Sequence, residues 1–197
     1  MTKPFSQACE NNKDPILQKL RPFFADAAYV LEIGSGTGQH AVHFAASMPS
    51  LQWQTSDLAH NHDGITCWCK EASLSNLKLP LVLDLNMAHW PITEVPAIYT
   101  ANTLHIVSTR LVARFFTGVS QHLAPHGKLA IYGPFNYHGQ FTSQSNAQFD
   151  AFLKTRDPDS GIRDIEWICE LAAAAELTLV TDHAMPANNR LLFFKRQ

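Results

Sequence analysis

The sequence contains 197 residues, of which 46% are hydrophobic and 16% are charged. This is the length of one ordinary domain with enough apolar material for a sizeable core, which excludes an intrinsically disordered chain, and we expect one domain over residues 1–197. Fifteen Lys and Arg stand against 17 Asp and Glu, a formal net charge of −2, so no excess of positive charge supports a nucleic-acid partner.

Neither a membrane nor a secretory protein is indicated. No run approaches the ~20 apolar residues of a membrane span, and residues 1–14 lack the apolar core of a signal peptide. We therefore expect a cytoplasmic protein with no membrane partner. The four cysteines, Cys9, Cys67, Cys69 and Cys169, do not suggest a disulfide framework in a domain of this length, and we expect reduced thiols.

Helical patterns alternate with short apolar runs along the chain. Asp14 and Pro15 have the form of an N-cap followed by a proline in the first turn, which predicts a helix over 14–24. The elements predicted after it are a strand at 28–33, a helix at 39–47, strands at 51–57, 81–84 and 97–101, a helix at 111–123, a strand at 128–132, short helices at 147–154 and 165–172, and a closing pair of strands at 177–181 and 190–195. This alternation predicts an α/β sheet with helices on both faces.

The most informative segment is the bend after the first strand, which carries Gly34, Ser35, Gly36 and Gly38. Glycine allows a tight turn and removes the Cβ that would block a ligand, and the following helix offers unpaired amide groups. A dinucleotide fingerprint requires glycine at position 39, where Gln39 stands, so the spacing disfavours a nicotinamide-dependent oxidoreductase. A simple tight loop is the alternative interpretation.

Asp57 is the second part of the pattern, since it ends the next predicted strand. A carboxylate at that place can accept hydrogen bonds from both hydroxyl groups of a ribose. The alternative is that Asp57 caps the following helix.

The combination Glu32-x-Gly34-x-Gly36-x-Gly38 resembles the first motif of the class I methyltransferases that use S-adenosylmethionine (SAM). The resemblance implies a Rossmann-like fold, with a mostly parallel seven-stranded sheet, an antiparallel terminal strand and SAM as cofactor. It also implies that Asp84 and Leu85 flank the adenine and that Asn102 lies near the methionine part. For Asp84, ordinary turn chemistry is the alternative.

A narrower resemblance covers nearly the whole chain. It is carried by the segments 31–40, 54–57, 133–142 and 161–164, and by 145–146, 149–150, 156–158 and 185–189. These segments resemble a little-characterised family of small methyltransferase-like proteins, a domain of unknown function with bacterial and animal members. The resemblance implies the fold and the cofactor, and it specifies no acceptor.

Residues for an acceptor are expected where the strands end. Tyr132, Asn136, Tyr137 and Gln140 offer polar groups near one such end, and we predict that they belong to the acceptor pocket or to a lid over it, with a plain surface loop as the alternative. His105 is the candidate general base if the acceptor is a hydroxyl group or an amine, and a structural histidine is the alternative. For Arg163 and Asp164 three interpretations stay open, which are a pair with each other, a cap of the next helix and a role in the site. The spacing of Cys67 and Cys69 is not that of a zinc site, so no metal is expected.

The leading hypothesis is a SAM-dependent methyltransferase acting on a small molecule. The alternative is a protein that binds SAM as a sensor or interaction module without catalysis, because both functions need the same binding groups. The pattern specifies neither the methylated atom nor the oligomeric state.

Overall fold

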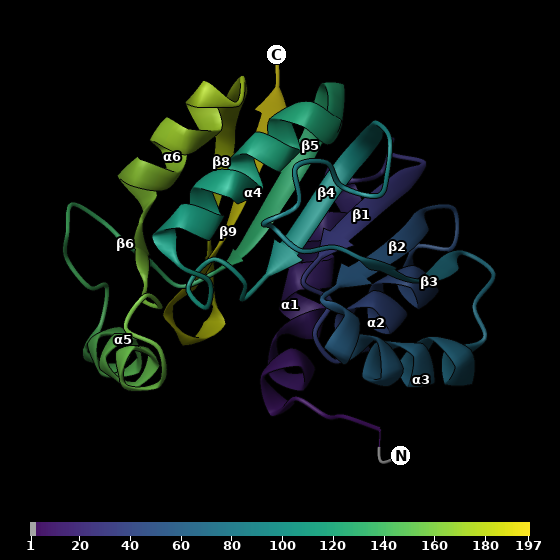
Figure 1. The fold of residues 1–197 in the computed structure, drawn as a ribbon, viewed down its shortest axis with the longest axis horizontal. Coiled ribbons are helices and arrows are strands. Elements are labelled where there is room, and N and C mark those ends of the chain that lie inside the picture. Colours follow the sequence, from purple (N-terminus) through teal and green to yellow (C-terminus); the bar gives the residue numbers. More distant parts are fainter. Residues whose placement is uncertain (1–2) are drawn as a thin grey trace.

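A seven-stranded mixed sheet with helices on both faces forms the centre of the molecule (Figure 1). The computed structural model describes residues 3–197. The strands are β1 (Tyr29–Ile33), β2 (Gln52–Asp57), β3 (Leu77–Val82), β4 (Val95–Ala101), β5 (Leu123–Gly133), β6 (Phe135–Asn136), β7 (Arg163–Asp164), β8 (Leu177–Met185) and β9 (Asn189–Arg196). The helices are α1 (Gln7–Phe23), α2 (Gln39–Ser47), α3 (His62–Ala72), α4 (Thr109–His122), α5 (Gln144–Arg156) and α6 (Ile165–Ala174), with short 3-10 turns η1 (Ala59–Asn61) and η2 (Pro186–Asn188).

The order of the strands in the sheet is β3-β2-β1-β4-β5-β9-β8. Strands β1 to β5 are parallel, and β9 runs antiparallel to both β5 and β8. The predicted fold class is confirmed. Strands β6 and β7 form a separate two-stranded sheet, which the sequence did not predict.

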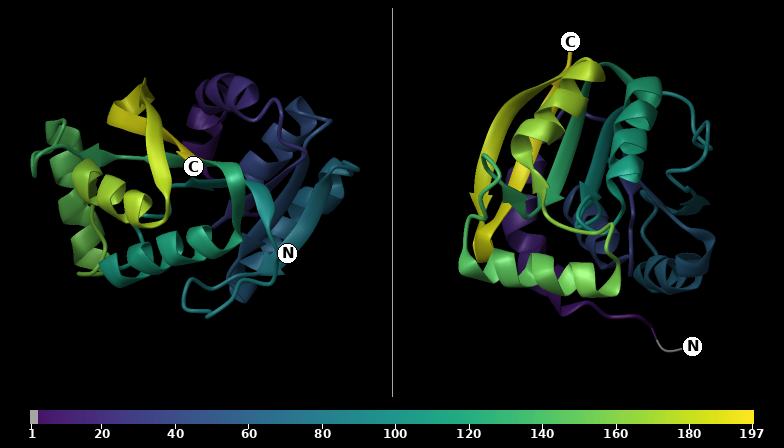
Figure 2. Two further views of the ribbon diagram at one scale, coloured as in Figure 1. Left: turned by 90° about the horizontal axis from the view of Figure 1, so that it is seen from above. Right: turned by 60° about the vertical axis from the view of Figure 1, so that its left-hand side comes forward.

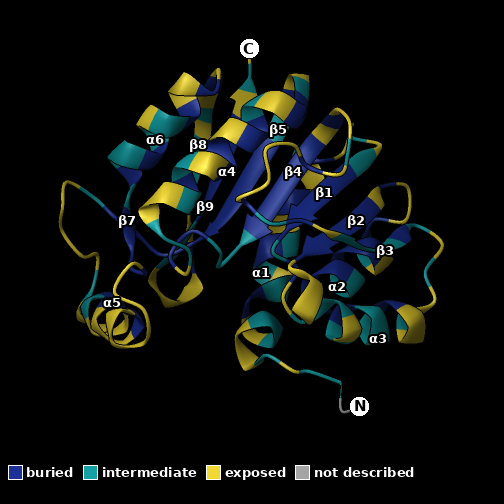
Figure 3. Cartoon of the chain, in the orientation of Figure 1, coloured by how far each residue is buried: buried dark blue, intermediate teal, exposed yellow. Residues whose placement is uncertain are grey.

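Alternate side chains of the central strands pack in two hydrophobic cores, one on each face of the sheet. Leu31 and Ile33 pack on the side of α4 and α6, and Val30 packs on the side of α1, α2 and α3. Strands covered on both faces are buried throughout, whereas the helices expose their outer sides (Figure 3). No helix within residues 3–197 is long and apolar enough to cross a bilayer.

Helix α1 begins earlier than predicted. Its cap is Ser6, whose Oγ accepts the amide of Cys9 at 3.3 Å, and Pro15 lies inside the helix instead of at its start. A proline inside a helix removes one backbone hydrogen bond and crowds the preceding turn. Here the buried face of α1, with Asn12, Ile16 and Leu20, keeps both halves packed against the molecule, and tertiary packing overrides the local signal.

The chain adds parallel strands to the sheet in opposite directions from its middle. The chain passes outward from β1 to β2 and β3, and outward from β4 to β5, so β1 and β4 are neighbours at a switch point. Ligands of open α/β sheets bind beyond the carboxyl ends of the strands at such a point. Helix α5 lies across this end of the sheet (Figure 2).

Candidate functional site

The glycine bend is attached to the end of β2. The amides of Gly34 and Ser35 both donate to the carbonyl of Ser56, at 3.1 and 3.0 Å, and the Oγ of Ser35 accepts the amide of Ser56 at 3.1 Å. The bend and the end of β2 therefore form one rigid unit, although about 20 residues of sequence separate them.

The glycines of the bend have different roles. Gly36 has φ of +59°, and no atom lies within 4 Å of the place where a Cβ would stand, so bare backbone faces open space there. Gly38 has φ of +91°, and a Cβ would come within 3.2 Å of Ile65 Cα and Trp68 Cβ. Gly38 thus allows α2 to approach α3, and it is not among the residues that line the cavity described below.

The carboxylate of Asp57 lies directly against the bend. Its Oδ2 accepts the amide of Gly36 at 2.7 Å, and its Oδ1 accepts the amide of Leu58 at 2.7 Å and the side-chain amide of Asn61 at 2.8 Å. A carboxylate has about four acceptor positions, so three are occupied by the protein. Asp57 can accept one more hydrogen bond as it stands, and a second one if Asn61 turns away.

Glu32 is a second carboxyl group beneath the bend. It is 2% exposed, and its Oε2 accepts hydrogen bonds from Ser35 Oγ at 2.9 Å and Trp53 Nε1 at 3.0 Å. Burial, with a smaller contribution from the nearby charge of Asp57, raises the pKa of Glu32 to about 7 against the effect of these two donors. Glu32 is therefore a buried acid that titrates near neutral pH.

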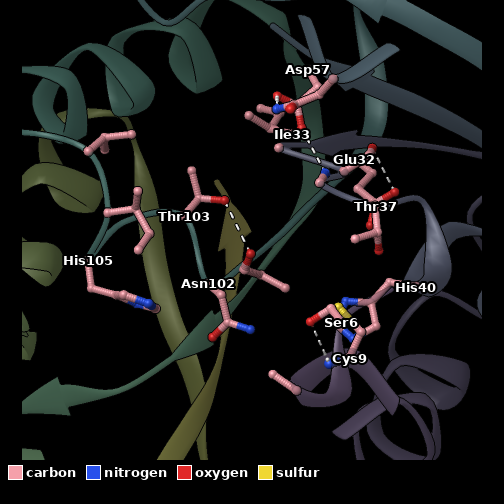
Figure 4. A pocket seen from close by; sticks show the side chains of 18 of the residues that line it. Ser6, Cys9, Glu32, Ile33, Thr37, His40, Asp57, Asn102, Thr103 and His105 are labelled. Atoms are coloured by element: carbon pink, nitrogen blue, oxygen red, sulfur yellow. Dashed lines mark hydrogen bonds between the residues drawn. The ribbon is translucent and has the colours of Figure 1, made fainter. Parts of the chain in front are cut away.

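These groups lie on the wall of a cavity of about 850 Å³ at the switch point. The cavity is at the large end of the range of small-molecule sites, ~300–1,000 Å³. Of the residues predicted to bind a cofactor, all except Gly38 line it: Glu32, Gly34, Ser35, Gly36, Asp57, Asp84, Leu85 and Asn102. His105 lies across the cavity from Glu32, Thr37 and His40 (Figure 4).

Asp84, Leu85 and Asn102 come from the ends of the neighbouring strands. The Oδ1 of Asp84 accepts both nitrogen donors of Asn86, at 2.8 Å from the backbone and 3.2 Å from the side chain, as in an ordinary turn. Leu85 is 8% exposed and joins the core under α4. Asn102 has φ of +55°, and its amide donates to the carbonyl of Tyr132 at 2.8 Å, so the chain bends sharply at the cavity wall.

His105 is a buried histidine at the cavity wall. Its ring lies edge-on to the ring of Phe149, with centroids 5.5 Å apart, and a Cβ added to Gly133 would lie 3.4 Å from Nδ1. Within residues 3–197, neither ring nitrogen has a hydrogen-bond partner. Burial lowers the pKa of His105 to about 4, and the positive charge of Arg163 acts in the same direction.

The four residues predicted for the acceptor pocket or its lid are not among the residues that line the cavity. Tyr132 is 2% exposed and its ring belongs to the core on the side of α1. Asn136 pairs with Asp164 in the small sheet, and the hydroxyl group of Tyr137 donates to Asp182 at 2.5 Å. Gln140 is in an exposed turn. The pairing of β6 with β7 leads the chain away from the cavity after β5.

Other segments form the rest of the cavity wall. They are the start of α1, the start of α2, helix α5 and the turn between β8 and β9, with the residues Ser6, Cys9, Asn12, His40, Ser145, Asn146, Phe149, Ala187 and Asn189. Asn12 Oδ1 and His40 Nε2 are 2.6 Å apart, which joins α1 to α2. The segments 145–146, 149–150 and 185–189 carried the narrower family resemblance, and this is the signal that marked them in the sequence.

Among solved structures, the chain is similar in fold to an O-methyltransferase family protein from Burkholderia thailandensis, with a TM-score of 0.80 and 17% identity over 94% of this chain and 58% of that chain. It is also similar to an O-methyltransferase from neocarzinostatin biosynthesis, solved with SAM and 2-hydroxy-5-methyl naphthoic acid (TM-score 0.79, 16% identity, 96% and 55% covered). A third is an O-methyltransferase family 2 protein from Planctomyces limnophilus in complex with apigenin (TM-score 0.72, 15% identity, 94% and 62% covered).

These likenesses show a common fold. This chain spans only 55% to 62% of the length of the three proteins. At the level of the sequence, the model of a family described as "protein of unknown function (DUF938)" matches residues 3–196. The match covers almost the whole chain, and the protein therefore belongs to the DUF938 family.

Proposed function

We propose that this protein is a SAM-dependent methyltransferase that acts on a small-molecule acceptor, with residues 1–197 as one domain. The observation that carries the proposal is the 2.7 Å hydrogen bond from the amide of Gly36 to Asp57 Oδ2. It brings the two halves of the sequence motif together on one cavity wall at the switch point of the sheet. The O-methyltransferases with the same fold support this assignment.

The residues of the wall fit the parts of SAM. The open space at Gly36 leaves room for a ligand against bare backbone. Asp57 would accept a hydrogen bond from the ribose, Asp84 and Leu85 would flank the adenine, and Asn102 would lie at the methionine end.

The charges of the wall also suit a cationic cofactor. SAM supplies a methyl group on a positively charged sulfur and carries an ammonium group. Among the described residues, the cavity is lined by the acidic side chains Glu32, Asp57 and Asp84 and by no Lys or Arg. Glu32, with a pKa of about 7, can meet a nearby cation by losing its proton at neutral pH.

His105 is the candidate general base on the acceptor side. With a pKa of about 4, its ring is neutral at pH 7 and can accept a proton. Gly133 lies beside Nδ1, so Nε2 is the nitrogen that would receive the proton of an acceptor hydroxyl or amine. The remaining contribution of the chain is positional, because methyl transfer depends on in-line approach of the acceptor. Asn146, Phe149 and Asn189 line the cavity and would orient that acceptor.

Two measurements on the full chain test the proposal. Calorimetry with S-adenosylhomocysteine should show one site per chain, and no binding would refute the proposal. Incubation of the protein with cell extract and SAM labelled in the methyl group should then place label in the small-molecule fraction. Binding without transfer would instead favour the non-catalytic SAM-binding protein.

A further inference from the structure

The segment between α5 and α6 lies against the backbone that carries His105. Four consecutive carbonyl groups, those of residues 104 to 107, each accept a hydrogen bond from residues 160 to 163. Arg163 Nε donates to Leu104 O at 3.1 Å, and Arg163 Nη2 donates to Val107 O at 2.6 Å. The amide of Gly161 donates to His105 O at 2.9 Å, and Ser160 Oγ donates to Ile106 O at 2.5 Å.

Arg163 is the centre of this arrangement. Its side chain is buried, the whole residue being 9% exposed, and Nη2 also donates to the carbonyl of Asp159 at 2.8 Å. Within residues 3–197 it has no ion pair, so its guanidinium is satisfied by backbone carbonyl groups. A buried cation is costly, and only the planar fork of arginine can reach two carbonyl groups three residues apart. An apolar side chain would fill the same space without holding the loop.

The segment is itself held by α5. Asp150, which is 5% exposed, accepts the amide of Ile162 at 2.8 Å through Oδ1 and pairs with Lys154 at 2.6 Å through Oδ2. Gly161 has φ of +153°, and a Cβ there would lie 2.9 Å from Asp150 Oδ1, so only glycine fits. The neighbour of Asp150 in sequence is Phe149, whose ring lies against His105. The same helix therefore supports His105 from its ring side and, through residues 160–163, from its backbone side.

This backbone support matters because the ring of His105 has no polar partner within residues 3–197 to orient it. The groups packed around the ring are Phe149 from α5 and the backbone of Gly133 from β5. Arg163 is the one charged group that acts on His105 among the described residues, and Asp150, Asp157 and Asp159 act in turn on Arg163.

We propose that Arg163 is a positioning residue, whose guanidinium, together with Ser160 and Gly161, holds the backbone of residues 104–107 so that the ring of His105 faces the cavity in one orientation. The role of that ring as a proton acceptor rests on the proposed function. The positioning of the ring by Arg163 does not rest on the proposed function. The positioning role and the proton-acceptor role can therefore fail separately.

The test is an NMR titration of the His105 ring in the full chain, with its signals assigned by comparison with His105→Gln. In Arg163→Met we expect the ring signals to broaden or split, because the loop is released, and the titration midpoint to rise, because a nearby like charge is removed. In Arg163→Lys we expect the low midpoint to be kept and the broadening to remain, since a lysine restores the charge but cannot reach both carbonyl groups.

Arg114→Met is the matched control. Arg114 is an exposed arginine of α4 that also donates to a backbone carbonyl, that of Asn86, and its loss should leave the His105 signals unchanged. If Arg163→Met does not fold, Ser160→Ala and Arg163→Lys carry the test, and Ser160→Ala should broaden the same signals to a smaller extent.

Unchanged line widths and midpoint for His105 in the folded Arg163 and Ser160 variants would overturn the positioning role. Binding of S-adenosylhomocysteine should stay within about threefold of wild type in these variants, because the hydrogen bonds of Arg163 and Ser160 involve none of the residues proposed to bind the cofactor. Failure of the wild-type protein to bind it would count against the proposed function and would leave the support of His105 standing.

Discussion

At Gly36 the backbone has φ of +59° and faces the cavity, with no atom within 4 Å of an added Cβ. Gly139 offers a matched comparison, because it has φ of +69°, equally open surroundings and a place outside the cavity wall. Either change to alanine should lower the free energy of unfolding by ~1–2 kcal/mol through backbone strain. Only Gly36→Ala should also abolish or strongly weaken binding of S-adenosylhomocysteine in calorimetry. Equal affinity for the two variants would contradict contact between the cofactor and this bend.

Asp57 holds the bend and would hold the ribose with the same carboxylate. Asp57→Ala should therefore weaken the binding of S-adenosylhomocysteine by ~1–3 kcal/mol, since charge-assisted hydrogen bonds are lost. Asn61→Ala is the informative control, because it removes one of the two hydrogen bonds to Oδ1 of Asp57 while the carboxylate remains. The affinity of Asn61→Ala for S-adenosylhomocysteine should stay within about threefold of wild type or improve. A large loss for Asn61→Ala with none for Asp57→Ala would place the ribose on the asparagine.

At the scale of the elements, the start of α1 is tied to the start of α2. Gln39 Oε1 accepts the amide of Ser6 at 2.5 Å, and its Nε2 donates to the carbonyl of Ser6 at 3.4 Å. The residue that excluded a dinucleotide fingerprint thus attaches the N-terminal helix to the cavity wall.

Gln39→Ala should loosen this end of α1. We expect faster amide hydrogen exchange at residues 6–12 and binding of S-adenosylhomocysteine about 3- to 10-fold weaker, the equivalent of one net hydrogen bond. Gln7→Ala is the control, because Gln7 lies on the exposed side of the same helix, where it contacts Asn11. Unchanged exchange in Gln39→Ala would mean that α1 is held by its apolar face alone.

Helix α5 shows why the spans predicted from hydrophobic periodicity were accurate for some elements and too short for others. It was predicted over 147–154 and extends over Gln144–Arg156, with a cap at Ser143. Its buried positions are Asn146, Asp150 and Leu153, so two of the three are polar and the usual apolar stripe is missing. The polar positions are those that face the cavity or support residues 160–163. By contrast, α4 has an apolar buried face, and its predicted span was close to the observed one.

At the scale of the whole molecule, the sheet and the cavity wall with the glycine bend and Asp57 were predictable because their signals are local. Strand β1 is largely apolar and the glycine bend follows it directly, while Asp57 is the last residue of β2. The rest of the cavity wall is assembled from α1, the loop at His105, α5 and the β8–β9 turn, which are far apart in the sequence. Only the path of the chain brings them together, so the spacing of residues pointed instead to Tyr132–Gln140, next to a strand end.

The burial of titratable groups at the wall of the cavity makes the stability of the whole molecule depend on pH. The pKa of Glu32 is raised from 4.5 to about 7, chiefly by burial, so between these values the native state keeps a proton that the unfolded chain has lost. The free energy of unfolding contributed by Glu32 therefore falls as the pH rises through this window. His40 and His105 act in the opposite sense, because burial lowers their pKa values from 6.5 to about 4 and the unfolded chain binds the extra protons.

Glu32→Gln separates these contributions, because glutamine has the same shape and its oxygen can still accept from Ser35 and Trp53. The free energy of unfolding of the variant minus that of wild type should increase from pH 4.5 to pH 7, by up to about 3 kcal/mol, and stay constant above pH 7. Below pH 6.5 both proteins should lose stability as His40 and His105 become protonated on unfolding. Urea denaturation at a series of pH values measures the difference directly. A difference that does not change with pH would show that Glu32 titrates alike in the folded and unfolded chains, and its proposed role beside a cationic cofactor would lose its physical basis.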